Sequence, residues 1–336
     1  MRHPRDNRPG RSWPAPSPWP FARPRFTRML AGLPEQRRGW AMDLTTGDLD
    51  VALIRDFRHD ARRRAQFNAL TERTYGFDFE QWYRDGFWSD SYQPHALLHD
   101  DRLVANVSVN LMSFEVDGAA RRYVQIGTVM TEPEYRQRGL GRLLLERVLA
   151  DWRERCDMLY LFANDTVLDF YPRFGFRRVI EHEPSAPVEA TPGDFIAVDM
   201  DDPARRRHFL DALEQAVPIS PLALRKAPGH VMFSCTSFLR DNVFHSTRHD
   251  AYAVAEHDGA DLLLLDVFAP RPLDPRFLAA ELARPETRRL RLGFTPFDTH
   301  GFTLRPVGND DALFVLGQAE PWLDRRRLMF PLLSHA

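Results

Sequence analysis

Two short stretches of this chain combine residue types that can hold and process a small ligand. The first is Arg136-Gln137-Arg138-Gly139-Leu140-Gly141-Arg142, which follows an apolar run ending in Val129-Met130-Thr131. Apolar residues from Leu140 to Leu149 recur at helical spacing, so Gly141 lies near the start of a helix with one buried face. Glycines at a helix start let backbone N–H groups converge on a phosphate, which the helix dipole also favours. This stretch therefore predicts a site for a phosphate-bearing ligand.

The second stretch, residues 164–176, combines an amide, a phenol and an aromatic turn. Asn164 comes first, and because Thr166 follows it we expect the amide to cap a helical turn. Phe170-Tyr171 comes next, and Phe174-Gly175-Phe176 predicts a tight return of the chain. A phenol with a pKa of about 10 is protonated at pH 7 and can donate that proton. On these residues alone, Tyr171 could equally be a core aromatic residue whose hydroxyl is satisfied locally.

Together the two stretches resemble the signatures of the GNAT N-acetyltransferase family. Arg136, Gly139 and Gly141 match its Arg/Gln-x-x-Gly-x-Gly/Ala pyrophosphate loop. Its second signature, Asn-x-x-Ala-x-x-aromatic/aliphatic-Tyr-x-x-x-Gly-Phe, is matched by Asn164, Phe170, Tyr171, Gly175 and Phe176, with Val167 in place of alanine. A Gly-x-Gly turn alone is common, but the two motifs stand in register. A nucleotide P-loop is excluded because no Lys-Ser/Thr pair follows Gly141, and the glycine spacing does not fit a dinucleotide fingerprint.

The resemblance implies a fold, a cofactor and a reaction. The fold is α/β, a mixed twisted sheet flanked by helices, and the cofactor is acetyl-coenzyme A. The acetyl group would pass to a primary amine of a small molecule or peptide by direct attack on the thioester. The residues that the resemblance assigns to the cofactor are Val129, Met130, Thr131, Arg136, Gln137, Arg138, Gly139, Leu140, Gly141, Arg142, Asn164 and Phe170. Tyr171 resembles the general acid that protonates the departing thiolate, and we expect no metal.

The general base does not follow from the family pattern. The predicted strand over residues 123–130 has no Asp or Glu, which many members carry there, and Gly127 stands roughly at that place. The chain ends in apolar residues 329–333 followed by Ser334-His335-Ala336, whereas ordinary termini are polar and frayed. We therefore name two candidate bases, the C-terminal carboxylate of Ala336 and the imidazole of His335. Eis proteins are similar in using their terminus in the active site; the alternative is a terminal segment that only packs against the second half.

Composition indicates a two-domain protein of a reducing compartment. The chain has 336 residues, of which 43% are hydrophobic, enough for two cores. Cys156 and Cys235 form no disulfide or metal pattern, which favours the cytoplasm. A net charge of −2 argues against nucleic-acid binding, and no apolar run is long enough for a membrane helix. The expected partner is the amine substrate, without nucleic acid or membrane, and a homodimer is left open.

Three segments are predicted along the chain. Residues 1–41 are rich in arginine and proline, and we expect a disordered, dispensable extension. Residues 42–185 form the catalytic GNAT domain. Residues 186–336 repeat its element order loosely, but residues 269–275 replace the glycine loop with a proline-rich run that lacks N–H groups. We interpret this half as a degenerate second GNAT-like domain, with an unrelated α+β domain as the alternative. The layout is similar to that of aminoglycoside-acetylating Eis proteins, in a shorter chain.

Apolar periodicity gives the expected elements. It predicts helices over residues 60–73, 79–88, 140–149, 203–217 and 277–283, and strands over residues 95–98, 103–116, 123–130, 160–163, 195–200, 231–234, 251–256, 261–268 and 289–294. An aromatic cluster lies where the family forms its acceptor-substrate wall, or else belongs to the core: Phe77, Phe79, Trp82, Tyr83, Phe87, Trp88 and Tyr92. The acceptor itself is not indicated. Transfer of another acyl group, or a non-catalytic acyl-coenzyme A sensor, is the alternative function.

Overall fold

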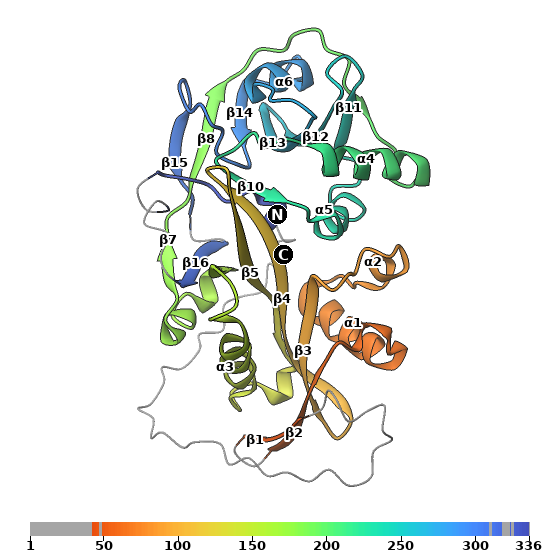
Figure 1. The fold of residues 1–336 in the computed structure, drawn as a ribbon, viewed down its shortest axis with the longest axis vertical. Coiled ribbons are helices and arrows are strands. Elements are labelled where there is room, and N and C mark those ends of the chain that lie inside the picture. The colour runs from red at the N-terminus through yellow and green to blue at the C-terminus, as the bar shows by residue number, and fades with distance from the viewer. Residues whose placement is uncertain (1–41, 47–48, 309–310, 318–322, 324–325, 336) are drawn as a thin grey trace. The chain divides into compact units, whose positions relative to one another are not determined.

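The chain forms two compact units. The computed structural model describes residues 42–46, 49–308, 311–317, 323 and 326–335. The first unit contains the described residues up to Glu80 together with residues 93–108 and 128–148, and the second contains residues 81–92, 109–127 and those from Leu149 onward. Long elements that belong partly to each unit are β4 (Arg102–Val116), β5 (Ala119–Thr131) and α3 (Leu140–Trp152), and the unit boundaries also fall within one residue of the ends of α2 (Glu80–Arg84) and β3 (Tyr92–His99) (Figure 1).

The first unit is built on antiparallel strands and one long helix. Strand β1 (Met42–Thr46) pairs with β2 (Leu49–Arg55), which pairs with β3 (Tyr92–His99), and residues 102–108 of β4 and 128–131 of β5 follow (Figure 1). A short 3-10 turn, η2 (Phe57–His59), leads into α1 (Ala61–Tyr75). Asp60 caps α1, since its Oδ1 accepts hydrogen bonds from the N–H groups of Arg62 at 3.0 Å and Arg63 at 3.1 Å. A glycine in the left-handed conformation ends the helix at Gly76.

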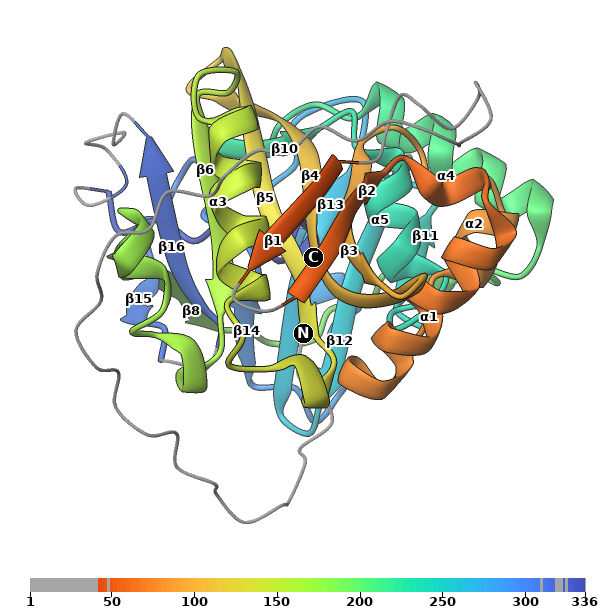
Figure 2. The same cartoon turned by 90° about the horizontal axis from the view of Figure 1, so that it is seen from below.

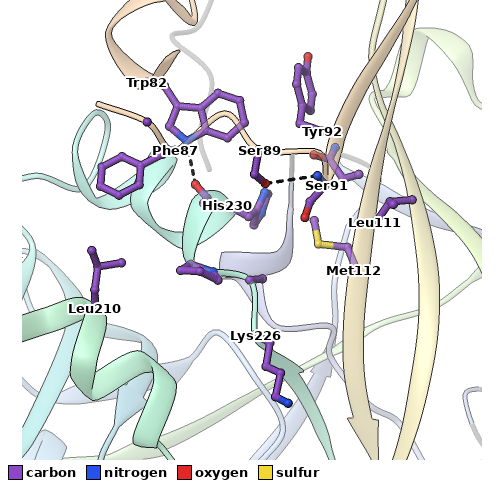
Figure 3. Close-up of a pocket in the computed structure, with 15 residues that line it drawn as sticks. Trp82, Phe87, Ser89, Ser91, Tyr92, Leu111, Met112, Leu210, Lys226 and His230 are labelled. Carbon is purple, nitrogen blue, oxygen red and sulfur yellow. Dashed lines mark hydrogen bonds between the residues drawn. The ribbon is translucent and has the colours of Figure 1, made fainter. Parts of the chain in front are cut away.

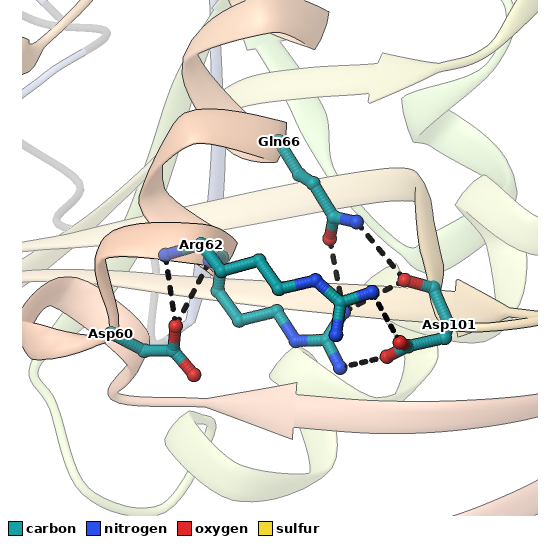
Figure 4. A network of polar contacts seen from close by, with 5 residues as sticks. Asp60, Arg62, Gln66 and Asp101 are labelled. Carbon is teal, nitrogen blue, oxygen red and sulfur yellow. Dashed lines mark hydrogen bonds and ion pairs between the residues drawn. The ribbon is translucent and has the colours of Figure 1, made fainter.

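Helix α1 is tied to the turn between β3 and β4 by one acidic residue. The guanidinium groups of Arg62 and Arg63 both pair with the Asp101 carboxylate, and their hydrogen bonds lower its pKa (Figure 4). The Asp101 carbonyl accepts further bonds from Arg63 at 2.8 Å and from Gln66 Nε2 at 3.0 Å. Asp100 and Asp101 both have positive φ, which a tight turn requires and aspartate tolerates. The network therefore holds the turn against the exposed side of α1.

The second unit contains the remaining strands of the first sheet. Residues 119–127 of β5 pair in parallel with β6 (Met158–Ala163), and β16 (Ala312–Gly317) lies antiparallel between β6 and β7 (Arg177–Val179). Strand β10 (Leu222–Arg225) pairs with residues 113–116 of β4. One side of this sheet carries an aromatic core in which Phe114, Tyr160 and Phe330 contact one another.

A second mixed sheet lies entirely within the second unit. Its order is β15 (Thr303–Pro306), β8 (His182–Pro187), β14 (Arg289–Leu292), β13 (Asp261–Phe268), β12 (Ala251–Asp258), β11 (Val243–Ser246) and β9 (Ile196–Ala197), and only β13 and β14 pair in parallel. Along β12 the side chains alternate between two buried clusters, as the period of a strand requires. One cluster contains α4 (Pro203–Gln215) and α5 (Pro228–Cys235), which lie side by side (Figures 1 and 2), and the other contains α6 (Pro275–Leu282).

The predicted fold class is confirmed, because the described residues form a mixed α/β structure with two mixed sheets. The predicted helices over residues 60–73, 140–149, 203–217 and 277–283 correspond to α1, α3, α4 and α6. The helix expected over residues 79–88 is only the short α2 (Glu80–Arg84), and the strand expected over residues 195–200 is only β9. No helix of the described part is long and apolar enough to cross a membrane.

One predicted element is wrong and another was not foreseen. Residues 231–234 belong to α5 and not to a strand, because Pro228 at a helix start gives this short apolar run a helical beginning. Strand β16, far along the chain, enters the first sheet between β6 and β7. Strand β8 contains residues on both sides of the predicted domain boundary after residue 185. The boundary itself stays a prediction. The expected extension over residues 1–41 lies outside the described residues.

Glu181 provides a pH-dependent test of the second unit. Its carboxyl group is 4% exposed and accepts a hydrogen bond from the Phe330 N–H at 2.8 Å, while burial raises its pKa from 4.5 to about 8. Between about pH 4.5 and 8 the folded chain keeps a proton that the unfolded chain releases. The stability contributed by this group is therefore present below pH 4.5 and is lost as the pH rises to 8.

We expect Glu181→Gln to remove this pH dependence, because glutamine stays neutral and can still accept the Phe330 hydrogen bond. The variant and the original protein should have similar melting temperatures near pH 5, and the variant should have the higher melting temperature at pH 8. The free energy of unfolding at pH 8 should differ by about 1.4 kcal/mol for each unit by which the pKa is raised. Thermal unfolding at the two pH values measures the difference. The exposed Glu189→Gln is the matched control. An equal change in melting temperature at pH 8 in both variants would contradict the assignment of this pH dependence to Glu181.

Candidate active site

The start of helix α3 forms an exposed loop rich in backbone donors. Gln137 has φ of 63° and Gly139 has φ of 80°, so the chain turns sharply before the helix. The Leu143 N–H bonds to the Gly139 carbonyl at 2.9 Å, which places the first helical turn over residues 140–142. N–H groups in a first turn have no partner within the helix. The loop residues 136–139 are exposed, so these donors are accessible to an anion.

The end of β5 approaches this loop. The Arg136 Nε donates to the Thr131 carbonyl at 3.2 Å, and a Cβ added to Gly141 would lie 3.8 Å from Thr131 Oγ1. The Tyr75 hydroxyl donates to the Val129 carbonyl at 3.0 Å. The structure thus brings the strand residues 129–131 and the loop residues 136–142, which the sequence assigned to one site, into contact with each other.

A strained residue marks the point where β5 leaves regular strand geometry. Thr128 has φ of 49°, which a β-branched residue adopts only under constraint. The fully buried Asn106 supplies that constraint, because its Nδ2 donates to the Thr128 carbonyl at 2.8 Å and to Ser108 Oγ at 2.9 Å. The irregular conformation reorients the backbone just before Val129. In a regular strand, the backbone N–H and C=O groups at this point would bond to a neighbouring strand. The irregular conformation can instead present such groups to a ligand that lies along the end of β5.

Arginines surround the loop, and one buried glutamate holds two of them. Glu132 is 1% exposed and pairs with Arg73 and with Arg102, the latter at 3.0 Å. Arg102 also pairs with Glu134 at 2.7 Å. Arg138 lies 5.6 Å from the centre of the Tyr135 ring, within cation–π range. Arg136 and Arg138 are exposed on the loop itself and add positive charge to the start of α3.

In the second unit, Asn164 and Phe170 each precede a short 3-10 turn. Asn164 is exposed, and its Oδ1 accepts a hydrogen bond from the Thr166 N–H at 3.0 Å, so the expected capping role is confirmed. The cap begins η4 (Asp165–Val167), and η5 (Tyr171–Phe174) follows. Phe170 is half-buried and packs against Phe174, with ring centres 5.0 Å apart. Their contacts with the cofactor stay predictions.

The position of Tyr171 is fixed by the packing of its ring against other aromatic rings. It is 6% exposed and lies among Phe170, Phe176 and Phe314 at ring distances of 5.2 to 6.0 Å. Its hydroxyl makes no hydrogen bond to any residue that the structure describes. Burial raises the pKa of Tyr171 to about 12, so the phenol keeps its proton at neutral pH. Such a group can act as an acid and cannot act as a base without strong assistance.

The C-terminal segment is buried in the second unit. The N–H groups of Met329 and Leu332 donate to Thr295 Oγ1 at 2.8 Å and to the Gly293 carbonyl at 2.7 Å. The Tyr160 hydroxyl donates to the Ser334 carbonyl at 3.3 Å. His335 stacks on Phe162 with ring centres 3.4 Å apart, and burial lowers its pKa well below the usual value. Ala336, the other candidate base, lies outside the described residues.

A cavity of about 390 Å³ opens beside helix α5 in the second unit (Figure 3). Its lining comprises Trp82, Gly86, Phe87, Ser89, Ser91, Tyr92, Asn110, Leu111, Met112, Leu210, Lys226, Ala227, Pro228, Gly229 and His230. The Trp82 Nε1 donates to the Gly229 carbonyl at 2.8 Å (Figure 3). A Cβ at Gly229 would lie 2.5 Å from the Phe87 carbonyl oxygen, so glycine permits this close approach.

The aromatic cluster that was predicted to form the acceptor-substrate wall is therefore divided between the cavity lining and the first unit. Of the aromatic cluster, Trp82, Phe87 and Tyr92 line the cavity, whereas Phe77 and Phe79 pack in the first unit. Trp88 packs behind the lining, against Trp82 at 5.8 Å and Tyr92 at 5.3 Å. Sequence reasoning missed the polar members of the lining, among them Asn110 and His230. No motif surrounds either residue, because the fold brings them together from positions far apart in the chain.

Comparison with known proteins identifies the first part of the chain. Residues 59–179 match the family model described as the acetyltransferase (GNAT) domain. The chain carries a GNAT domain. This match covers both signature stretches and confirms the resemblance on which the site residues depend. No curated protein matches the chain.

Solved structures with a similar fold extend over most of the chain. One is a probable N-acyltransferase of unknown function from Enterococcus faecalis V583, with 13% identity, coverage of 79% of this chain and 72% of that chain, and a TM-score of 0.54. A GCN5-related N-acetyltransferase from Kribbella flavida has 16% identity, coverage of 80% and 71%, and a TM-score of 0.52. Eis1 from Mycobacterium abscessus has 16% identity, coverage of 76% and 70%, and a TM-score of 0.51. These likenesses concern the fold, and they are consistent with two GNAT-like halves.

The loop geometry predicts how two substitutions of Gly141 should differ. Gly141→Trp places a bulky side chain over the first helical turn and should weaken binding of coenzyme A by more than about tenfold, or 1.4 kcal/mol. Gly141→Ala is the matched control, because its methyl group would meet only Thr131 Oγ1 at an ordinary contact distance. Isothermal calorimetry measures both affinities. Equal affinities in the original protein and both variants would remove the basis for this binding site.

Proposed function

We propose that this protein is an N-acetyltransferase that uses acetyl-coenzyme A to acetylate a primary amine. The observation that carries the proposal is the exposed start of α3, where a left-handed glycine, the N–H groups of a first helical turn and two exposed arginines suit an anion. This donor set suits the pyrophosphate of coenzyme A. Tyr171, with a hydroxyl that bonds to no described residue, is the group best suited to acid chemistry.

The chain's own residues divide the work of binding. Loop residues 136–142 would hold the pyrophosphate through N–H groups and guanidinium charge, and the strand end at residues 129–131 would hold the pantetheine arm. Asn164 and Phe170 would complete the contacts to that arm. When bound, the cofactor supplies the acetyl group as an activated thioester. The resident groups then need to move two protons, one from the amine and one to the sulfur.

Tyr171 is the proposed proton donor to the sulfur. Its raised pKa keeps the phenol protonated before the reaction, and a thiol with an ordinary pKa of about 8.5 is the stronger acid. Transfer from Tyr171 therefore requires that the sulfur carry developing negative charge close to the hydroxyl. The resulting phenolate would regain its proton from solvent. The hydrophobic ring contacts of Tyr171 serve to fix the position of the hydroxyl.

The proposed base is at the end of the chain. The described part of the chain ends at the buried His335, one residue before Ala336, and an α-carboxylate with an ordinary pKa of about 3.5 is charged at neutral pH. His335 is the second candidate. Its lowered pKa means that the imidazole is neutral at pH 7 and able to accept a proton, although it binds that proton weakly. We further propose a cytoplasmic location, which suits the two free cysteines.

Replacement of Tyr171 tests the acid. Tyr171→Phe keeps the ring contacts and removes the hydroxyl, so turnover should fall by roughly 10²- to 10⁴-fold while coenzyme A affinity changes little. Release of free coenzyme A with a panel of amines measures turnover. Tyr252→Phe, at another buried tyrosine, is the matched control. Turnover within a factor of about two of the original protein would assign Tyr171 to packing alone.

An extended C-terminus tests the base. Two glycines appended after Ala336 move the carboxylate while leaving the buried Ser334 and its hydrogen bond from Tyr160 in place. We expect activity to be lost, with melting temperature and coenzyme A binding retained. His335→Ala separates the candidates, because a large loss of turnover is expected only if the imidazole is the base. Full activity of the extended protein would refute the carboxylate assignment.

A further inference from the structure

The cavity beside α5 has walls that suit a flat apolar group. Trp82, Phe87 and Tyr92 provide aromatic faces, while Met112 and Leu210 provide aliphatic surface (Figure 3). Trp82 and Tyr92 are held rigidly, because their rings pack against each other at 5.4 Å and against Trp88 behind them. The volume of the cavity, about 390 Å³, lies within the range of small-molecule sites. Rigid aromatic walls of this kind bind ring-bearing ligands at little cost in side-chain entropy.

Two polar groups of the lining have unused hydrogen-bonding capacity. Asn110 is only 5% exposed, and its Nδ2 has no hydrogen-bond partner among the described residues. His230 Nε2 is likewise buried and without a partner in that part of the chain. The imidazole of His230 is held by the backbone of Leu333 and His335, and burial lowers its pKa to about 4. Buried polar groups are nearly always paired, so a ligand that bonded to both residues would satisfy them.

The charge of the lining is unusual for a site that binds amines. Among the residues that the structure describes, no carboxylate belongs to the lining. The nearby Asp85 carboxylate is engaged by Arg206 at 3.3 Å. The only lysine of the chain, Lys226, is exposed and lines the cavity. A molecule with several ammonium groups would leave its charges uncompensated here and would be repelled by Lys226.

We propose that this cavity binds the acceptor, a monoamine with an aromatic or similarly bulky apolar body, in preference to polycationic amines. The assignment rests on the proposed acetyltransferase function. The ring lies between Trp82 and Met112, and the amine, bound in its uncharged form, donates a hydrogen bond to the lone pair of His230 Nε2. Asn110 Nδ2 donates to a polar substituent of the ligand. Because no carboxylate of the described residues lines the cavity, the uncharged amine, which is the form that attacks a thioester, is favoured there.

A substrate comparison tests the assignment without altering the protein. Release of coenzyme A is measured with 2-phenylethylamine and tryptamine against spermidine and kanamycin, and binding of each amine is measured separately by calorimetry. We expect kcat/KM for the aromatic monoamines to exceed that for the polyamines by more than about tenfold. A preference for spermidine or kanamycin would overturn the assignment while leaving the acetyltransferase function intact.

Two variants place the binding in this cavity. Leu210→Trp fills it and should weaken 2-phenylethylamine binding by more than about tenfold, whereas Leu213→Trp, on the same helix and outside the lining, is the matched control. Asn110→Asp keeps the shape and introduces a carboxylate, so relative kcat/KM should shift towards spermidine. Equal effects of both tryptophans, together with unchanged selectivity of Asn110→Asp, would overturn the assignment.

The two proposals fail in distinguishable ways. If 2-phenylethylamine binds, and Leu210→Trp weakens that binding, but no amine releases coenzyme A, the cavity assignment stands as a binding site and the acetyltransferase function falls. If amines are acetylated but 2-phenylethylamine neither binds nor reacts, the function stands and the cavity assignment falls. Unchanged melting temperatures establish that each variant is folded. If a tryptophan variant does not fold, Asn110→Asp and the substrate comparison decide.

Discussion

Burial of the last described residues is the constraint on which the second unit depends. Phe330 and Leu333 are fully or almost fully buried, in the aromatic core of one sheet and in the core beneath α4 and α5. Burying a segment of backbone requires partners for its N–H groups, and Thr295, Glu181 and Gly293 supply them. Gly293 also provides space, since a Cβ there would lie about 3 Å from Leu265 and 3.1 Å from Leu332. The hydrophobic core, the hydrogen bonds and Gly293 thus all accommodate the C-terminal segment of the described chain.

This constraint joins structural and chemical requirements in the same residues. The segment that completes the hydrophobic core also delivers His335 to Phe162 and presents backbone groups to His230. Any change that loosens the terminus would therefore disturb both the core and the cavity lining. A buried terminus also loses conformational entropy, which only extensive burial can offset. The segment has that burial, with Ser334 and Leu333 both fully inaccessible.

Sequence reasoning succeeded where function depends on local backbone geometry. The loop at residues 136–142 was predicted because a left-handed Gly139 and a helix start follow from a few adjacent residues. The cap at Asn164 was predicted for the same reason. The cavity was not, since Asn110 lies on β4 and His230 on α5, and their sequence neighbours carry no signal. The short apolar run at residues 231–234 was assigned to a strand because periodicity cannot distinguish a short buried strand from a buried helix. The insertion of β16 is a long-range pairing, which local patterns do not encode.

The unsatisfied polar groups provide the final link between stability and function. Asn110 Nδ2, His230 Nε2 and His335 Nε2 are all buried without partners among the described residues, and each such group costs about 1–3 kcal/mol. A sequence selected only for stability would replace them with apolar side chains of similar shape, because that change removes the penalty. Their clustering near the buried terminus, with His230 in contact with the backbone of Leu333 and His335, concentrates the penalty in one place. A ligand that bonds to these groups would recover the loss on binding. Burial lowers the pKa values of His230 and His335, so both imidazoles are neutral at pH 7 and can accept a hydrogen bond from an uncharged amine.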